Sequence, residues 1–112
     1  MPRYIALVNF TEQGVRNFKD TSKRAAAFEN AAKRAGVAVR EVYWTLGHHD
    51  GVLIIEATDD PSATAMMVYL ASLGNVRTQT LRAFTRAEIG EILSQVPSGG
   101  GEAMQRKDKK RR

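Results

Sequence analysis

The hydrophobic positions of the chain change their spacing several times between the first residue and about residue 96. Four short runs are rich in β-branched and aromatic residues, a composition that favours strands. The first run contains Tyr4, Ile5 and Val8, and the third, which starts at Val52, is almost entirely apolar. These runs predict strands over residues 3–10, 37–46, 52–57 and 76–84.

A helix is predicted over residues 20–35, because its apolar residues recur at three- and four-residue spacing. Thr21 or Ser22 is the expected N-cap, and Gly36 stands where a helix commonly ends in a left-handed residue. The apolar stripe consists of Ala25, Phe28, Ala32 and Ala35.

Two further helices are predicted from their boundary residues. Asp59 or Asp60 can cap the second helix, Pro61 suits its first turn, and Gly74 ends it. Met66 and Met67 lie within it at core spacing, and we expect both to be packing residues. Thr85 is the expected cap of a last, short helix over residues 86–95.

The predicted order of elements is β-α-β-β-α-β-α. The second and third strands are joined by a tight turn, from Gly47 to Gly51, and should form a hairpin. A split βαβ unit with an internal hairpin is the ferredoxin-like motif. We therefore predict an α+β fold, a ferredoxin-like βαββαβ domain with an antiparallel four-stranded sheet and an added C-terminal helix.

Composition and charge refine this picture. The chain has 112 residues and no cysteine, so it fits one domain and has no disulfide, thiolate-zinc or thiol chemistry. Residues 1–96 carry eleven basic and ten acidic side chains, whereas residues 97–112 carry six and two. The net charge of +5 thus lies mostly in the last segment. We expect residues 1–96 to be the domain and 97–112 to be a disordered Gly/Ser linker with a basic tail.

Several segments resemble the GYD-domain family. They are the turn from Thr45 to Asp50, the run Ile54-Ile55-Glu56-Ala57, and the block from Gly74 to Phe84 that begins Gly-Asn-Val-Arg-Thr. In the Gly-X-Tyr-Asp motif of that family, Gly47 and Asp50 match and His49 stands in the tyrosine place. The resemblance implies a dimeric α/β barrel, in which two sheets pack face to face, and it implies no particular reaction.

Period-two alternation suggests which side chains lie on the sheet face that the helices leave bare. A partly apolar face is costly to expose, so a second sheet should cover it. Glu56 and Arg82 are expected to face each other there, either as an ion pair that fixes the dimer register or as part of a small-ligand cavity between paired sheets. The complete set of candidate ligand-binding residues is Asn9, Tyr43, His49, Asp50, Glu56, Thr80 and Arg82.

Other chemistry has little support in the sequence. His48 and His49 are consecutive, so they point to opposite sides of an extended chain and are poorly placed to share a metal ion. No phosphate loop or hydrolase elbow is present, so we expect no metal and no cofactor, and we assign no catalytic residue. Trp44 is interpreted as a core residue.

Three functions remain open at this point. The first is a homo-oligomeric GYD-type protein that binds a small molecule between paired sheets. The second is an interaction or structural protein whose sheet face serves only oligomerisation. The third is weak nucleic-acid binding through the basic tail, which lacks aromatic residues for base stacking. No apolar run reaches the roughly 20 residues that span a bilayer, and no signal peptide is recognised, so we expect a cytoplasmic protein.

Overall fold

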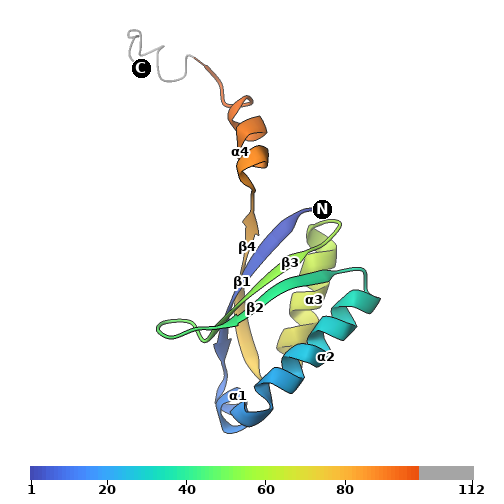
Figure 1. Cartoon of the computed structure of the whole chain (residues 1–112), viewed down its shortest axis with the longest axis vertical. Helices are drawn as coiled ribbons and strands as arrows, with labels where there is room; N and C mark the ends of the chain where they lie inside the picture. The colour runs from blue at the N-terminus through green and yellow to red at the C-terminus, as the bar shows by residue number, and fades with distance from the viewer. Residues whose placement is uncertain (99–112) are drawn as a thin grey trace.

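A computed structural model describes residues 1–98 of the chain. Its centre is an antiparallel sheet of four strands in the order β2-β3-β1-β4 (Figure 1). This order confirms the ferredoxin-like α+β fold, because the central β1 is flanked by β3 and β4 as a split βαβ unit requires. The strands are β1 (Arg3–Phe10), β2 (Ala38–Trp44), β3 (Gly51–Glu56) and β4 (Val76–Ala83).

The helices follow the predicted order, with one short helix and a 3-10 turn added. The two long helices pack on the same face of the sheet (Figure 1). The helical elements are α1 (Glu12–Arg16), the 3-10 turn η1 (Phe18–Asp20), α2 (Thr21–Arg34), α3 (Asp60–Ser72) and α4 (Arg86–Leu93).

The helix caps agree with the sequence in two of three cases. The Asp59 side chain accepts a hydrogen bond from the Ser62 N–H at 3.0 Å and caps α3. The Thr85 side chain caps α4 in a complete capping box with Glu88. The predicted cap of α2 is wrong: the helix starts at Thr21 itself, and the Thr21 hydroxyl accepts a hydrogen bond from the indole of Trp44 instead.

Helix α1 lies between the first predicted strand and the first predicted helix, in a segment for which the sequence predicts no helix. Thr11 caps it through a hydrogen bond from the Gly14 N–H to the Thr11 hydroxyl. Gly14 resembles a loop residue, but it is required by packing: a Cβ atom there would lie 2.0 Å from the carbonyl oxygen of Asn75. Glycine therefore marks a close approach of two backbones in this turn, and not a break in structure.

The hydrophobic core lies between the sheet and helices α2 and α3. Alternate residues of β1 and β3 point into it, and Ile55 is completely buried. The prediction for Met66 and Met67 is confirmed, since both are buried on the inner side of α3. The core consists of Tyr4, Ala6, Val8, Phe28, Ala32, Val37, Leu53, Ile55, Ala57, Ala63, Met66, Met67 and Val76.

Trp44 is not a core residue, contrary to the prediction. Its side chain stands at the end of β2 and is half exposed. It lies on the helix-covered side of the sheet, where its N–H reaches the first residue of α2. The ring stays half exposed because β2 is an edge strand with few neighbours to bury it, and the bond to Thr21 holds it at the rim of the core.

The C-terminal expectations fall largely outside the described residues. The linker and basic tail predicted over residues 97–112 begin at Pro97, and residues 99–112 lie beyond the described part. Within residues 1–98, none of the helices has the length and apolar character that crossing a bilayer demands.

Candidate functional site

The side of the sheet that carries no helix is the first candidate surface, and we call it the free face. The strand registers place on it the residues that alternate with the core residues. In β1 and β3 these side chains are only partly exposed, although no helix within residues 1–98 covers them. The free face consists of Arg3, Ile5, Leu7, Asn9, Ala38, Glu41, Tyr43, Val52, Ile54, Glu56, Arg77, Gln79, Leu81 and Ala83.

The centre of the free face is apolar. Ile5 pairs with Ile54 on one side and with Leu81 on the other, and Leu7 pairs with Val52. These side chains are therefore neighbours on three adjacent strands. A contiguous apolar surface of this kind commonly marks an interaction site.

A charged cluster closes one end of the free face. Glu56 accepts hydrogen bonds from Arg3 at 2.5 and 3.1 Å and from Arg40 at 3.0 Å. Arg3 lies opposite Glu56 in the β1–β3 register, and Arg40 is the extra residue of a bulge in β2. The hydrogen bonds from Arg3 and then from Arg40 hold the pKa of the Glu56 carboxyl below its usual value.

The predicted Glu56–Arg82 pair is wrong. Arg82 lies opposite Tyr4 and Thr80 opposite Ala6, so both belong to the helix-covered side of the sheet. The guanidinium of Arg82 lies 4.3 Å from the centre of the Phe84 ring and donates to backbone carbonyls. The error arises in β4, where both alternating sets of residues mix polar and apolar side chains, so that the sequence does not reveal which set faces the helices.

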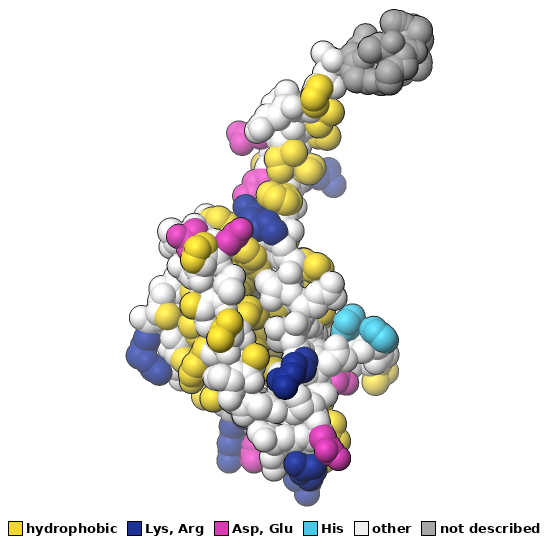
Figure 2. Space-filling model, turned by 180° about the vertical axis from the view of Figure 1, so that it is seen from behind, with side chains coloured by type: hydrophobic (Ala, Val, Ile, Leu, Met, Phe, Trp, Pro, Cys, Tyr) yellow, Lys and Arg dark blue, Asp and Glu magenta, His cyan; other side chains and the backbone are white. Residues whose placement is uncertain are grey.

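Three candidate residues meet at the turn between β2 and β3. Asn9 donates to the carbonyl of His48 at 2.8 Å, and its side-chain oxygen lies 2.9 Å from Nδ1 of His49. The carboxylate of Asp50 accepts from the backbone N–H of Phe10 at 2.8 Å. These bonds fix the base of a loop that projects from the sheet (Figure 1), and the two histidines lie at one edge of the molecule in Figure 2.

The six candidate residues other than Arg82 are thus divided among three places. Tyr43 and Glu56 lie on the free face, Asn9 joins that face to the turn of His49 and Asp50, and Thr80 stands apart on the helix-covered side. Ligand binding by these residues stays a prediction. Among residues 1–98, no group of three or more histidine, aspartate or glutamate side chains is arranged to hold a metal ion.

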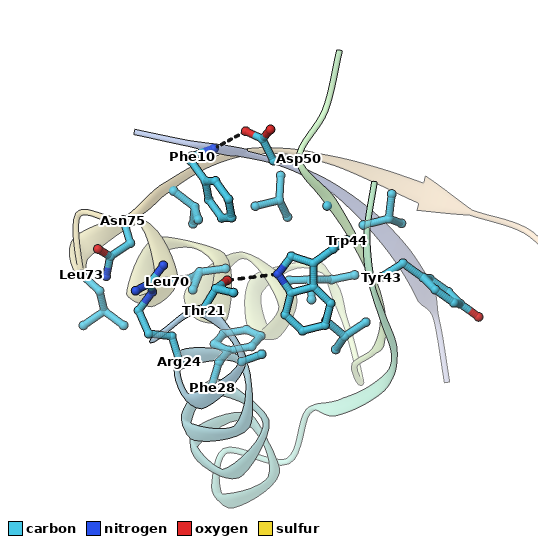
Figure 3. Close-up of a pocket in the computed structure, with 17 residues that line it drawn as sticks. Phe10, Thr21, Arg24, Phe28, Tyr43, Trp44, Asp50, Leu70, Leu73 and Asn75 are labelled. Carbon is cyan, nitrogen blue, oxygen red and sulfur yellow. Dashed lines mark hydrogen bonds between the residues drawn. The ribbon is translucent and has the colours of Figure 1, made fainter. Parts of the chain in front are cut away.

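The described residues also enclose a cavity, and it lies on the helix-covered side. It opens between the start of α2, the end of α3 and the strands β1, β2 and β3 (Figure 3). Its volume is about 80 Å³, and its empty space reaches about 640 Å³ when the open mouth is included. The apolar lining residues include Val8, Phe10, Ala25, Phe28, Val42, Leu53, Leu70 and Val76.

Polar side chains stand at the rim of this cavity. Thr21 and Trp44 are joined by their hydrogen bond on one side, and Arg24 and Asn75 lie on the other side (Figure 3). Arg24 donates through Nη1 to the Asn17 carbonyl at 2.6 Å. Its Nη2 is buried and has no hydrogen-bond partner within the described chain.

Tyr4 of β1 shows how the core anchors helix α3. The hydroxyl of Tyr4 donates to the Asp60 carboxylate in the first turn of α3. Burial raises the pKa of Tyr4 to about 12, and the bond to Asp60 adds to the effect. Tyr4 is therefore a structural donor and not a candidate acid or base near neutral pH.

Helix α4 extends away from the domain (Figure 1) and makes no extensive contact with any other element of residues 1–98. Its apolar side chains include Ile89 and Leu93, which are exposed, and hydrophobic side chains run along it in Figure 2. An isolated helix of eight residues is marginal in water. Ile89 and Leu93 thus form a second apolar surface, besides the free face, that no other element of residues 1–98 covers extensively.

Comparison with known proteins identifies the family. The GYD domain model matches residues 4–93, which is most of the chain. The chain belongs to the GYD-domain family. It is similar to a protein of Thermus thermophilus named "Glutamine synthetase and cystathionine beta-lyase binding protein", with 33% identity over 90 residues. The matched region covers 80% of this chain and 95% of that relative. No solved structure shows a significant match.

Sequence reasoning missed two features of these surfaces. The partners of Glu56 could have been found from the topology, because antiparallel pairing sets the start of β1 against the end of β3 and brings Arg3 to Glu56. The cavity, and the Arg24 Nη2 that has no partner within residues 1–98, left no signal in the sequence. Arg24 resembles any other charged residue of an amphipathic helix, and only the three-dimensional packing shows that its terminal nitrogen is buried.

Proposed function

We propose that this GYD-domain protein is a homo-oligomeric binding module that associates with other proteins. The observation that carries the proposal is the apolar free face around Ile5, Ile54 and Leu81, which no element within residues 1–98 covers. A second copy of the chain can cover it, because an isologous two-fold contact needs only one self-complementary surface. Such a contact gives the dimeric α/β barrel that the family resemblance implies.

Polarity along the free face favours a defined register. The apolar centre is bordered at one end by the cluster of Glu56, Arg3 and Arg40. A hydrophobic centre with a polar rim is the usual anatomy of a protein interface. The charged end also disfavours other alignments of the two sheets, since a shifted sheet would set apolar side chains against these charges.

Helix α4 supports self-association independently of the free face. The side chains of Ile89 and Leu93 are exposed, because α4 extends away from the rest of residues 1–98 (Figure 1). Packing against another subunit would bury these side chains and would stabilise a helix that is too short to be stable alone. The proposed oligomer therefore uses both the sheet face and α4.

The relative from Thermus thermophilus suggests what the oligomer binds. That protein is named for binding glutamine synthetase and cystathionine beta-lyase, and it is similar to this chain over nearly its whole length. We propose protein partners for this chain on that ground, and those two enzymes are the first candidates. Nucleic acid is a weaker alternative, since the net positive charge lies mainly beyond residue 96.

The first test is the mass of the chain in solution. Light scattering should give a multiple of the 12.4 kDa subunit mass at micromolar concentration. The variant Ile54→Lys should be a folded monomer, because a charge in the centre of the contact is not compensated. The matched control Val68→Lys lies on the exposed side of α3 and should keep the parent's mass.

The second measurement tests the partners. Surface-bound full-length chain should retain purified glutamine synthetase or cystathionine beta-lyase from its own host, and the Val68→Lys control is measured beside it. A stable monomer of the parent chain would overturn the proposed self-association. Failure to retain either enzyme at micromolar concentration would overturn these two partners.

A further inference from the structure

We propose that the cavity between α2 and the sheet binds a small carboxylate with an apolar body, and that Arg24 binds its carboxylate group. This site lies on the opposite side of the sheet from the free face, so it does not depend on the proposed oligomer. It also differs from a cavity between paired sheets, because all of its lining residues come from one chain.

The size and lining of the cavity define the body of the ligand. A single water molecule needs roughly 10–15 Å³ of such space. At about 80 Å³ the cavity has room for more than one water, and its walls offer little polar surface to hold water. Phe28 and Leu53 are buried behind it, and Ala25 leaves space where a larger side chain of α2 would fill it. An aliphatic group fits this environment.

The unpaired nitrogen of Arg24 defines the charge of the ligand. Arg24 places a positively charged guanidinium group at the rim. A buried donor without a partner is costly, and the cost is greater for a charged group. Within residues 1–98 no carboxylate forms an ion pair with Arg24. A ligand carboxylate would accept a charge-assisted hydrogen bond from Nη2.

The other polar residues of the rim are already engaged. Asp50 is the acidic residue of the lining, and its carboxylate accepts the Phe10 N–H on a different side of the cavity from Arg24 (Figure 3). The indole N–H of Trp44 donates to Thr21 at 3.0 Å. Asn75 accepts a hydrogen bond from Gln13 through Oδ1 at 3.0 Å. Arg24 is thus the charged group of the rim with a donor to spare, and its position sets where the anionic end of the ligand lies.

Trp44 provides a direct readout, because it is the chain's single tryptophan and stands at the rim of the cavity. The full-length chain is titrated with 4-methylpentanoate, which is transparent at the excitation wavelength of tryptophan, and with the uncharged 4-methylpentanamide. Saturable change in Trp44 fluorescence is expected for both. The carboxylate should bind roughly tenfold to a hundredfold more tightly, as a charge-assisted hydrogen bond provides.

Three variants separate the contributions. Arg24→Met should remove the preference for the carboxylate and should melt close to the temperature of the parent, because it loses the exposed bond from Nη1 to the Asn17 carbonyl but also removes an unsatisfied buried donor. Arg34→Met, an exposed change on the same helix, should leave the preference intact. Ala25→Leu should fill the cavity and abolish the response to both compounds. If Arg24→Met does not fold, Arg24→Lys replaces it and should weaken carboxylate binding.

Several results would contradict a carboxylate site at Arg24. No saturable change of Trp44 fluorescence at millimolar carboxylate would overturn it. Equal affinity for the acid and the amide would remove the role of Arg24, and so would an unchanged preference in Arg24→Met. Undiminished binding by a folded Ala25→Leu variant would place the ligand outside the cavity.

Discussion

The two faces of the sheet are built from alternate residues of the same strands, yet they differ in what covers them. On one face Ala6, Val8 and Ile55 are buried under α2 and α3. On the other face, Ile5 and Ile54 are equally apolar residues, but within residues 1–98 only neighbouring strands shield them from solvent. A strand with apolar residues on both sides is typical of a sheet that is buried on both sides. The free face therefore has the composition of an interior surface without a described cover.

The largest expected effect is a difference in unfolding free energy between alanine variants of two adjacent isoleucines, one on each face of the sheet. Ile55→Ala deletes a completely buried side chain and should lower the free energy of unfolding by about 2–5 kcal/mol. Ile54→Ala removes the same atoms from the free face, and in a monomer it should cost about 1 kcal/mol or less. Urea unfolding of both variants measures the difference.

The dependence of stability on protein concentration distinguishes the same two variants further. The proposed oligomer makes the stability of the parent rise with concentration, because subunit binding favours the folded state. Ile54→Ala should weaken that dependence, whereas Ile55→Ala should keep it and shift the whole curve. A similar cost for both variants at low concentration, where subunits dissociate, would mean that the free face is also covered within one chain.

The sequence predicted one face of this sheet better than the other, and particular residues show why. The core side was predictable because periodicity in β1, β3 and α2 agrees, and Phe28 and Met66 lie where spacing predicts. On β4 the set that contains Thr80 and the set that contains Leu81 each mix polar and apolar residues, so the parity was wrong and Arg82 was placed on the free face. Edge strands carry this ambiguity because neither of their faces is fully buried.

The candidate site was less predictable than the fold. The turn of His49 and Asp50 was recognised as a unit, and its contact with Asn9 brings together three of the predicted residues. The bulge at Arg40 and the buried end of Arg24 were not predicted. Both depend on how elements distant in sequence approach each other, which local patterns do not encode.

The C-terminal helix provides the second test of the comparison. Ending the chain after Phe84 removes α4, which has no extensive contact with the rest of residues 1–98, so the subunit should stay folded and its circular dichroism should lose only the helical signal of α4 itself. The oligomer should dissociate at least in part, because Ile89 and Leu93 would no longer bury their side chains on a partner. Light scattering measures this, and a chain ended after Val96 is the control. Unfolding of the shorter chain would show instead that α4 stabilises its own domain.

The smallest expected effect concerns the charged end of the free face and its dependence on pH. Arg3 and Arg40 lower the pKa of Glu56 in the folded chain below its ordinary value of 4.5. A carboxyl with a lowered pKa in the folded state stabilises the protein above the unfolded pKa, and this contribution is lost as the pH falls through the folded pKa. Glu56→Gln should therefore be less stable than the parent at pH 6, and the two should converge as the pH drops below about 4.

Thermal unfolding from pH 3 to pH 7 measures the difference, with Glu29→Gln on the exposed side of α2 as a control that should follow the parent throughout. Although the side chain of Glu56 is only 14% exposed, its two arginines are about half exposed, so solvent screening should keep the effect modest. A constant gap between parent and Glu56→Gln at every pH would mean that shape, and not charge, determines what Glu56 contributes at this end of the sheet.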